Sequence, residues 1–161
     1  MYRRVVLSTV ILCAALAGRG AFLPNAAHAA QASGVCKLSI SGDDMMRFDQ
    51  TELKVSKDCA EVEVTLIHTG KLPAQVMGHN WTLVKTADLA GVATDGLGAG
   101  LPDDYVKPGD ARVIAHTKVI GGGQSTSVRF ALSKLTAGES YSFLCTYPGH
   151  SAFMKGMFKI S

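Results

Sequence analysis

The stretch Cys59-Ala-Glu-Val-Glu-Val-Thr-Leu-Ile-His68 alternates apolar and polar side chains. Its apolar positions are Val62, Val64 and Leu66, and the positions between them carry Glu or Thr. Successive side chains of a β-strand point to opposite faces of the sheet, so this pattern predicts a strand with one face in a core and the other in water. The stretch therefore indicates a β fold.

The same alternation recurs on both sides of this stretch. Strand-like runs lie at residues 36–42, 125–133, 140–145 and 154–161. Turn signals rich in Gly, Pro and Asp lie at residues 41–43, 107–110, 121–123 and 136–138. Many short strands without long alternating helices predict one domain with an antiparallel β-sandwich of Greek-key type.

Residues 86–100, TADLAGVATDGLGAG, differ from the rest of the chain because they are rich in Ala and Gly and contain few β-branched residues. They predict a short helix, or two half-turns, on the flank of the sandwich. The glycines at 96, 98 and 100 form an incomplete dinucleotide-binding fingerprint that follows no βαβ unit, which argues against a phosphate-binding loop.

Residues 1–29 have the features of a secretory signal peptide. A short basic segment precedes the apolar run 5–17, and Ala27-His28-Ala29 fits the small-x-small rule for cleavage. We expect cleavage after Ala29 and export of a single mature domain, residues 30–161. The alternative is an uncleaved membrane anchor, but the apolar run is short and has no stop-transfer pattern.

Export changes the charge of the protein. The full chain has 16 Lys+Arg and 13 Asp+Glu. Arg3, Arg4 and Arg19 leave with the signal peptide, so the mature domain carries 13 basic and 13 acidic residues. A nearly neutral chain without a basic stripe gives no reason to expect nucleic acid or an anionic membrane as a partner.

Three cysteines remain after cleavage, because Cys13 lies in the signal peptide. Exported proteins favour disulfides. Cys36 and Cys59 each open a strand-like run, so we expect these two to pair. Cys145 is then a free thiol, and a free thiol survives export when it is buried as a small apolar side chain, modified or bound to a metal.

Cys145 begins the stretch Cys145-Thr-Tyr-Pro-Gly-His150-Ser-Ala-Phe-Met154, which places three potential metal ligands in one loop. A fourth, His79, lies in the loop sequence QVMGHNW. Two imidazoles and a thiolate near one plane, with a weak axial thioether, form a blue-copper electron-transfer site. Zinc would favour a second thiolate or a carboxylate. A Cys–His nucleophile would be oxidised after export and would leave Met154 without a role. The sequence therefore favours copper.

With these residues the chain resembles the azurins, a bacterial group of the cupredoxin family, over essentially its whole mature length. The matching stretches are LPAQVMGHNW (72–81), VATDG (92–96), VIAHTK (113–118) and CTYPGHSAFMKG (145–156). Four residues separate Cys145 from His150, whereas plastocyanin-like loops have only two there. The resemblance implies a Greek-key sandwich of about eight strands with a helical flap, carrying one type 1 copper ion.

The resemblance also implies a role for each residue around the metal. The expected equatorial ligands are His79, Cys145 and His150, and the expected axial groups are Met154 and the Gly78 carbonyl. Around these ligands, Asn80 is expected to tie the two ligand loops together through Thr146. The backbone amides of Asn80 and Tyr147 are expected to bind the cysteine sulfur, which tunes the reduction potential.

A docking patch around the exposed edge of His150 is a further implication of the resemblance. It consists of Met46, Leu72, Val76, Met77, Leu97, Tyr147, Pro148, Ala152 and Phe153. Exposed apolar patches mark interaction sites. Many azurins have phenylalanine in place of Tyr147 and leucine in place of Phe153, which leaves the choice of partner open. His68 matches a family histidine whose protonation is coupled to redox state in some members.

The function implied is that of a monomeric periplasmic electron carrier without enzymatic activity or a membrane anchor. The expected partners are soluble redox proteins, namely a c-type cytochrome, a copper nitrite reductase or an amine dehydrogenase. Two other functions remain open. One is copper delivery with incidental redox cycling, and the other is a copper enzyme, which would need an open coordination position.

Overall fold

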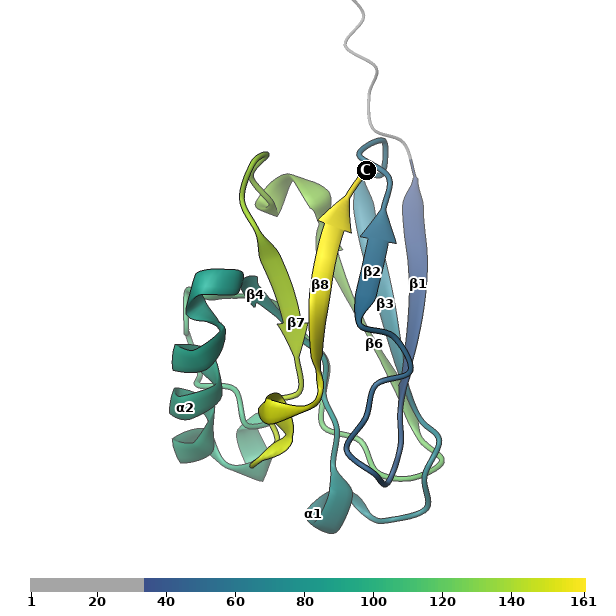
Figure 1. The fold of residues 1–161 in the computed structure, drawn as a ribbon, viewed down its shortest axis with the longest axis vertical. Helices are drawn as coiled ribbons and strands as arrows, with labels where there is room; N and C mark the ends of the chain where they lie inside the picture. Colours follow the sequence, from purple (N-terminus) through teal and green to yellow (C-terminus); the bar gives the residue numbers. More distant parts are fainter. Residues whose placement is uncertain (1–33) are drawn as a thin grey trace, which may run out of the picture.

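A computed structural model describes residues 34–161, and the expected signal peptide lies outside these residues. The described chain is a β-sandwich with a helix on one flank (Figure 1). Its strands are β1 (Val35–Gly42), β2 (Glu52–Val55), β3 (Glu61–His68), β4 (Thr82–Lys85), β5 (Val113–His116), β6 (Ser125–Ala131), β7 (Tyr141–Leu144) and β8 (Lys155–Ile160). Its helical segments are α1 (Ala74–Met77), α2 (Leu89–Ala99) and the 3-10 turns η1 (Thr86–Asp88), η2 (Leu101–Asp103), η3 (Leu132–Lys134) and η4 (His150–Ala152). Within residues 34–161, no helix has the length and apolar character that crossing a membrane requires.

The strands form two sheets, one in the order β1-β3-β6 and the other in the order β2-β8-β7-β4-β5. The predicted sandwich is confirmed, but the prediction of purely antiparallel pairing is wrong. β1 pairs with β3, and β2 pairs with β8, in parallel. Between β1 and β3 the chain passes through β2 in the opposite sheet, and it returns in its original direction. Alternation of side chains reports which face of a strand is buried and not which way the strand runs.

Aromatic and aliphatic side chains from both sheets fill the space between them. Val62, Val64 and Leu66, the alternating residues of β3, are all fully buried. Trp81 stacks on Phe130 of β6 and on Phe143 of β7, with ring centroids 6.3 and 6.1 Å apart. The two sheets therefore share one close-packed core, which gives the loops at the sandwich ends a firm base.

The predicted helix over residues 86–100 is confirmed, since η1 and α2 lie there. It covers the outer face of the larger sheet, where Val92 of α2 packs on Val84 of β4 and Leu144 of β7. β7 is therefore buried along its whole length, and β4 is buried along all but its last residue. A strand covered on both sides has no polar face, which is why residues 82–84 show no alternation.

Arg112 fastens this helical flap to the loop before β5. Its guanidinium donates to Asp95 of α2 at 2.6 Å and to Asp110 at 2.6 and 2.8 Å. The hydrogen bonds from Arg112 lower the pKa of Asp110 to about 2. The Asp110 carboxylate is therefore charged at neutral pH, so the link between the flap and the sheet is an ionic one.

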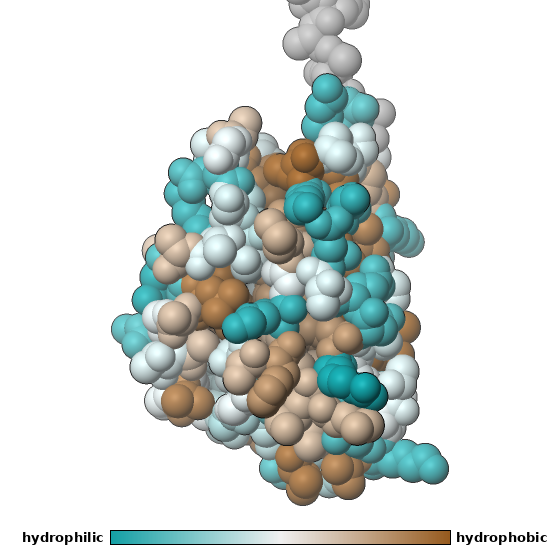
Figure 2. Space-filling view, viewed as in Figure 1, coloured by the Kyte–Doolittle hydropathy of each residue, from teal (hydrophilic) through white to brown (hydrophobic). Residues whose placement is uncertain are grey.

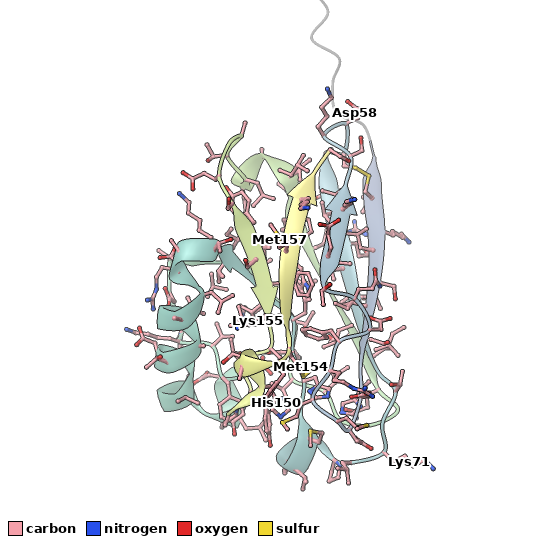
Figure 3. All side chains as sticks on the ribbon, viewed as in Figure 1. Asp58, Lys71, His150, Met154, Lys155 and Met157 are labelled. Carbon is pink, nitrogen blue, oxygen red and sulfur yellow. A yellow bond between two sulfur atoms is a disulfide. The ribbon has the colours of Figure 1, made fainter. Side chains whose placement is uncertain are left out.

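Cys36 and Cys59 form the predicted disulfide, which joins the start of β1 to the loop before β3. Figure 3 shows it near Asp58, at the upper end of the sandwich, while His150 and Met154 lie at the lower end. The cross-link closes a loop with a sequence separation of 23 residues.

Replacing Cys36 and Cys59 together by serine should lower the free energy of unfolding by about 3 kcal/mol, because the open chain gains conformational entropy when unfolded. Urea denaturation of the metal-free protein measures this loss. The double variant should keep the visible spectrum of the metal-loaded protein, because the disulfide lies at the far end of the sandwich. A changed spectrum would contradict this separation of the two ends.

Candidate metal centre

Three buried side chains meet at the lower end of the sandwich. His79 lies between α1 and β4, Cys145 directly follows β7, and His150 begins η4. None of the three is more than 2% exposed. The Nδ1 atoms of His79 and His150 are 3.1 Å apart, and Cys145 Sγ lies 3.6 Å from His150 Nδ1. All three ligand atoms lie within 4.8 Å of one another, so one metal ion can contact them all.

The ring of His79 is held by its surroundings so that Nδ1 points into the site. Its Nε2 donates to the Asp43 carbonyl at 2.8 Å. Because a carbonyl can only accept, the proton sits on Nε2, and Nδ1 keeps a free lone pair. The ring also stacks on His68, with centroids 4.3 Å apart, and the His79 backbone pairs with Ile120 through hydrogen bonds of 3.0 and 2.9 Å.

His68 supports the ring of His79 by stacking on it. Its Nε2 donates to the Met77 carbonyl at 2.7 Å, and its Nδ1 accepts from the Gly70 amide at 3.0 Å. Both ring nitrogens are therefore used, and the ring is 1% exposed. His68 thus connects the segment before β4 to the turn after β3.

Burial sets the protonation of the three ligand side chains. It lowers the pKa of His79 and brings the pKa of His150 to about 4, so both imidazoles are neutral at pH 7. It raises the pKa of the Cys145 thiol to about 12, although the backbone amides of Asn80 and Tyr147 hydrogen-bond to the sulfur. A buried thiolate needs a cation to compensate its charge, and two neutral imidazoles beside it complete a metal-binding donor set.

Asn80 joins the two ligand loops. Its Nδ2 donates to Thr146 Oγ1 at 2.6 Å, and its Oδ1 accepts from the Thr146 amide at 2.8 Å. Asn80 follows His79 and Thr146 follows Cys145, so this pair of bonds fixes one ligand relative to the other.

Met154 lies beside the three ligands and is fully buried. Its carbonyl accepts from the Cys145 amide at 2.9 Å, and its own amide donates to the His150 carbonyl at 2.7 Å. A Cβ added at Gly42 would lie 2.8 Å from His79 Cδ2 and 3.1 Å from the Met154 methyl. The end of β1 therefore packs on both side chains at a position where only glycine fits.

Gly78 is also a position of close approach. An added Cβ would lie 2.5 Å from the Ala74 carbonyl oxygen and 2.7 Å from Tyr147 Cε2. The Tyr147 hydroxyl donates to the Gln75 carbonyl of α1 at 2.8 Å. Tyr147 therefore packs between α1 and the ligand loop, and only 9% of it is exposed.

The imidazole of His150 meets the surface at its outer edge. Within residues 34–161, the fully buried side-chain nitrogens and oxygens without a partner are Trp81 Nε1 and Thr82 Oγ1. His150 Nε2 is not one of them, and it makes no hydrogen bond to the described residues. This atom therefore keeps some contact with solvent, although the residue as a whole is 2% exposed.

Apolar side chains gather around this edge. Figure 2 shows them at the lower end of the molecule, where α1 lies in Figure 1. The exposed members of the expected patch are Leu72 (38%), Val76 (58%), Leu97 (53%) and Phe153 (70%), together with Pro148 and Ala152. Met46 and Met77 are only partly exposed.

Met45 is 67% exposed, and the docking patch implied by the resemblance did not include it. Met46 adopts a left-handed backbone conformation with a φ of 55°. Its side chain packs against the buried cluster of Cys145, Tyr147 and Met154. The two adjacent methionines therefore differ in exposure, and no sequence signal predicts which of them is exposed.

A buried site with two histidines and one cysteine matches the chemistry of known copper proteins. The model of the plastocyanin/azurin family of copper-binding proteins matches residues 34–161. The chain belongs to this family. It is 56% identical to the azurin of Pseudomonas chlororaphis over 121 residues, which cover 75% of this chain and 94% of that protein.

Two further relatives support this assignment to the family. The azurin of Bordetella pertussis is 55% identical over 125 residues, covering 78% of this chain and 83% of that protein. The solved structure of azurin Az-iso2 from the methylotroph Methylomonas sp. strain J has a TM-score of 0.76 and 43% identity, and the match covers 78% of this chain and 98% of that one. The chain is a blue copper protein that transfers single electrons between redox proteins through a Cu(II)/Cu(I) site.

Replacing Cys145 by serine should abolish the intense visible band of the copper-loaded protein, because that band requires a thiolate bound to Cu(II). Absorption spectroscopy after addition of Cu(II) measures the effect. A serine variant that is still blue would rule out Cys145 as a ligand.

Proposed function

We propose that the protein is a monomeric periplasmic electron carrier whose copper is bound by His79, Cys145 and His150, with Met154 and the Gly78 carbonyl as weak axial ligands. The observation that carries the proposal is the buried group of three ligand atoms within 4.8 Å, next to an exposed apolar surface. Copper bound there would supply a one-electron couple tuned by its axial ligand.

The surrounding residues favour rapid electron transfer because they hold the ligands in place before the metal binds. His79 is fixed by Asp43, His68 and Ile120, and the Asn80–Thr146 bonds fix the second ligand loop to the first. A preorganised donor set rearranges little between two oxidation states. The reorganisation that accompanies each electron is therefore small.

Electrons are proposed to enter and leave through the outer edge of His150. This edge keeps solvent contact, whereas Cys145, His79 and Met154 are fully buried. The docking patch around it is apolar and suits a small, short-lived interface, as redox partners require. The proposed partner is a c-type cytochrome, with a copper nitrite reductase or an amine dehydrogenase as other members of the same class.

The proposed function includes neither catalysis nor copper delivery. A catalytic metal needs an open coordination position, and four side chains and a carbonyl close this site. Copper delivery requires ready release of the metal, which is disfavoured by ligands that are at most 2% exposed.

Residues 1–29 are proposed as the export signal. N-terminal sequencing of the periplasmic protein tests cleavage after Ala29, and an intact N-terminus would contradict it.

Replacing Met154 by leucine should leave copper bound but raise the reduction potential, because losing an axial donor destabilises Cu(II) more than Cu(I). Voltammetry of the copper-loaded variant measures the shift. Met157→Leu is the matched control, since Met157 lies 49% exposed on β8 (Figure 3). An unchanged potential in the Met154 variant would show that its thioether is not axial.

Replacing Val76 by glutamate should slow electron transfer to a c-type cytochrome without changing the copper spectrum. The reason is that a charge in the apolar patch must lose water when the partner docks. Stopped-flow kinetics measures the rate. Met157→Glu introduces the same charge at an exposed apolar position on β8 and should leave the rate unchanged. Equal rates for the Val76 variant and the unmodified protein would place the docking surface elsewhere.

A further inference from the structure

Asp104 lies at the point where the helical flap meets both ligand loops. It follows η2, and both Asp104 and Tyr105 adopt left-handed conformations, with φ of 54° and 52°. Two consecutive non-glycine residues in this region are strained, and such strain persists only where the surrounding contacts impose it. The contacts made by Asp104 therefore hold the turn in this conformation.

The backbone carbonyl of Asp104 accepts hydrogen bonds from both ligand loops. The donors are Asn80 Nδ2, at 2.7 Å, and Thr146 Oγ1, at 3.5 Å. Asn80 directly follows His79, and Thr146 directly follows Cys145. The Asp104 carbonyl therefore bonds to the residue that follows each of two ligands in sequence. It makes no hydrogen bond to the ligands themselves.

The Asp104 carbonyl, together with the Thr146 amide, determines which way the Asn80 side-chain amide faces. A carbonyl can only accept, so the group that Asn80 presents to it must be the NH2. The Asn80 oxygen is then left to accept from the Thr146 amide, as observed at 2.8 Å. Without the Asp104 carbonyl, the Thr146 backbone would be the only group fixing the orientation of the Asn80 amide, and the link between the ligand loops would be less firmly specified.

The side chain of Asp104 holds this carbonyl in position. Its Oδ1 accepts from the Val119 amide at 2.7 Å, a charge-assisted bond. Val119 precedes Ile120, whose backbone pairs with His79. The half-buried carboxylate thus anchors the strained turn to the same segment that supports His79.

Helix α2 packs against the turn at residues 104–105. A Cβ added at Gly96 would lie close enough to the Tyr105 carbonyl oxygen to clash, so the helix packs directly against the backbone of the turn. The amide of Tyr105 also donates to the Gly100 carbonyl at 2.8 Å. The flap is held to the sheet by Arg112, and the turn therefore has a firm support.

We infer that Asp104 is a positioning residue of the copper centre. Its carboxylate fixes the turn at residues 104–105, and its carbonyl orients the Asn80 amide that joins the two ligand loops. This inference rests on the ligand set proposed above. The helical flap then has a role in electron transfer, because it keeps the metal geometry constant.

Asp104→Gly tests this role, because glycine adopts the left-handed conformation without strain and removes only the bond to Val119. We expect a shifted reduction potential, altered copper hyperfine coupling in the electron paramagnetic resonance spectrum, and about tenfold faster loss of copper to a chelator. Asp104→Asn should behave like the unmodified protein, because asparagine keeps an oxygen acceptor and tolerates this conformation.

The neighbouring Asp103 supplies the matched control. Its side chain is exposed and makes no hydrogen bond within the described residues, so Asp103→Gly should leave all three measurements unchanged. Unmodified values in Asp104→Gly, or equal effects of glycine at both positions, would overturn the inference. An Asp104→Asn variant that behaves like Asp104→Gly would overturn the role of the oxygen acceptor.

A measurement on the unmodified protein keeps the test independent of whether Asp104→Gly folds. In the diamagnetic Cu(I) form, the Val119 amide should exchange slowly with solvent by nuclear magnetic resonance, and rapid exchange would overturn the inference. Failure of the ligand set itself would look different, because the unmodified protein would then lack the blue band altogether.

Discussion

The burial of the Cys145 thiol sets the chemistry of the metal site. Cys145 is fully buried, and burial raises its pKa to about 12. As a metal ligand it must lose its proton, and only a cation at the sulfur can compensate that charge. The neutral imidazoles of His79 and His150 complete the donor set without adding charge. The three side chains therefore form a donor set for a metal cation.

The sandwich explains how this site can be both enclosed and close to a partner. The sheets share a core around Trp81, and the ligands lie on loops at one end of it. Tyr147 and Met154 pack with Cys145 in one buried cluster, while the outer edge of His150 reaches an apolar surface. The proposed route for electrons through His150 is therefore short, while a thiolate at Cys145 would stay away from water and oxidants.

Several features followed from local sequence patterns. The alternation at residues 59–68 predicted β3, and the short separation of Cys145, His150 and Met154 predicted a shared loop. Other features did not. The parallel pairing of β1 with β3 depends on a passage through the opposite sheet, and the burial of Tyr147 depends on its bond to Gln75, which is 72 residues away in sequence. Met45 is exposed whereas Met46 packs on the buried cluster beside Cys145, and this difference between two adjacent methionines is decided by tertiary contacts.

Five of the eight strands (β1, β3, β6, β7 and β8), the flanking helix, the disulfide and the types of metal ligand could be predicted before folding, because each depends on side-chain chemistry or on spacing along the chain. The short strands β2, β4 and β5 could not, because none of them carries a long alternation. The support that Asp104 gives to the expected Asn80–Thr146 link became visible only in the folded chain. Asp104 reaches Asn80 across 24 residues and Thr146 across 42. Such contacts join segments that become neighbours only when the sheets pack and the flap closes on them, and no local pattern records that packing.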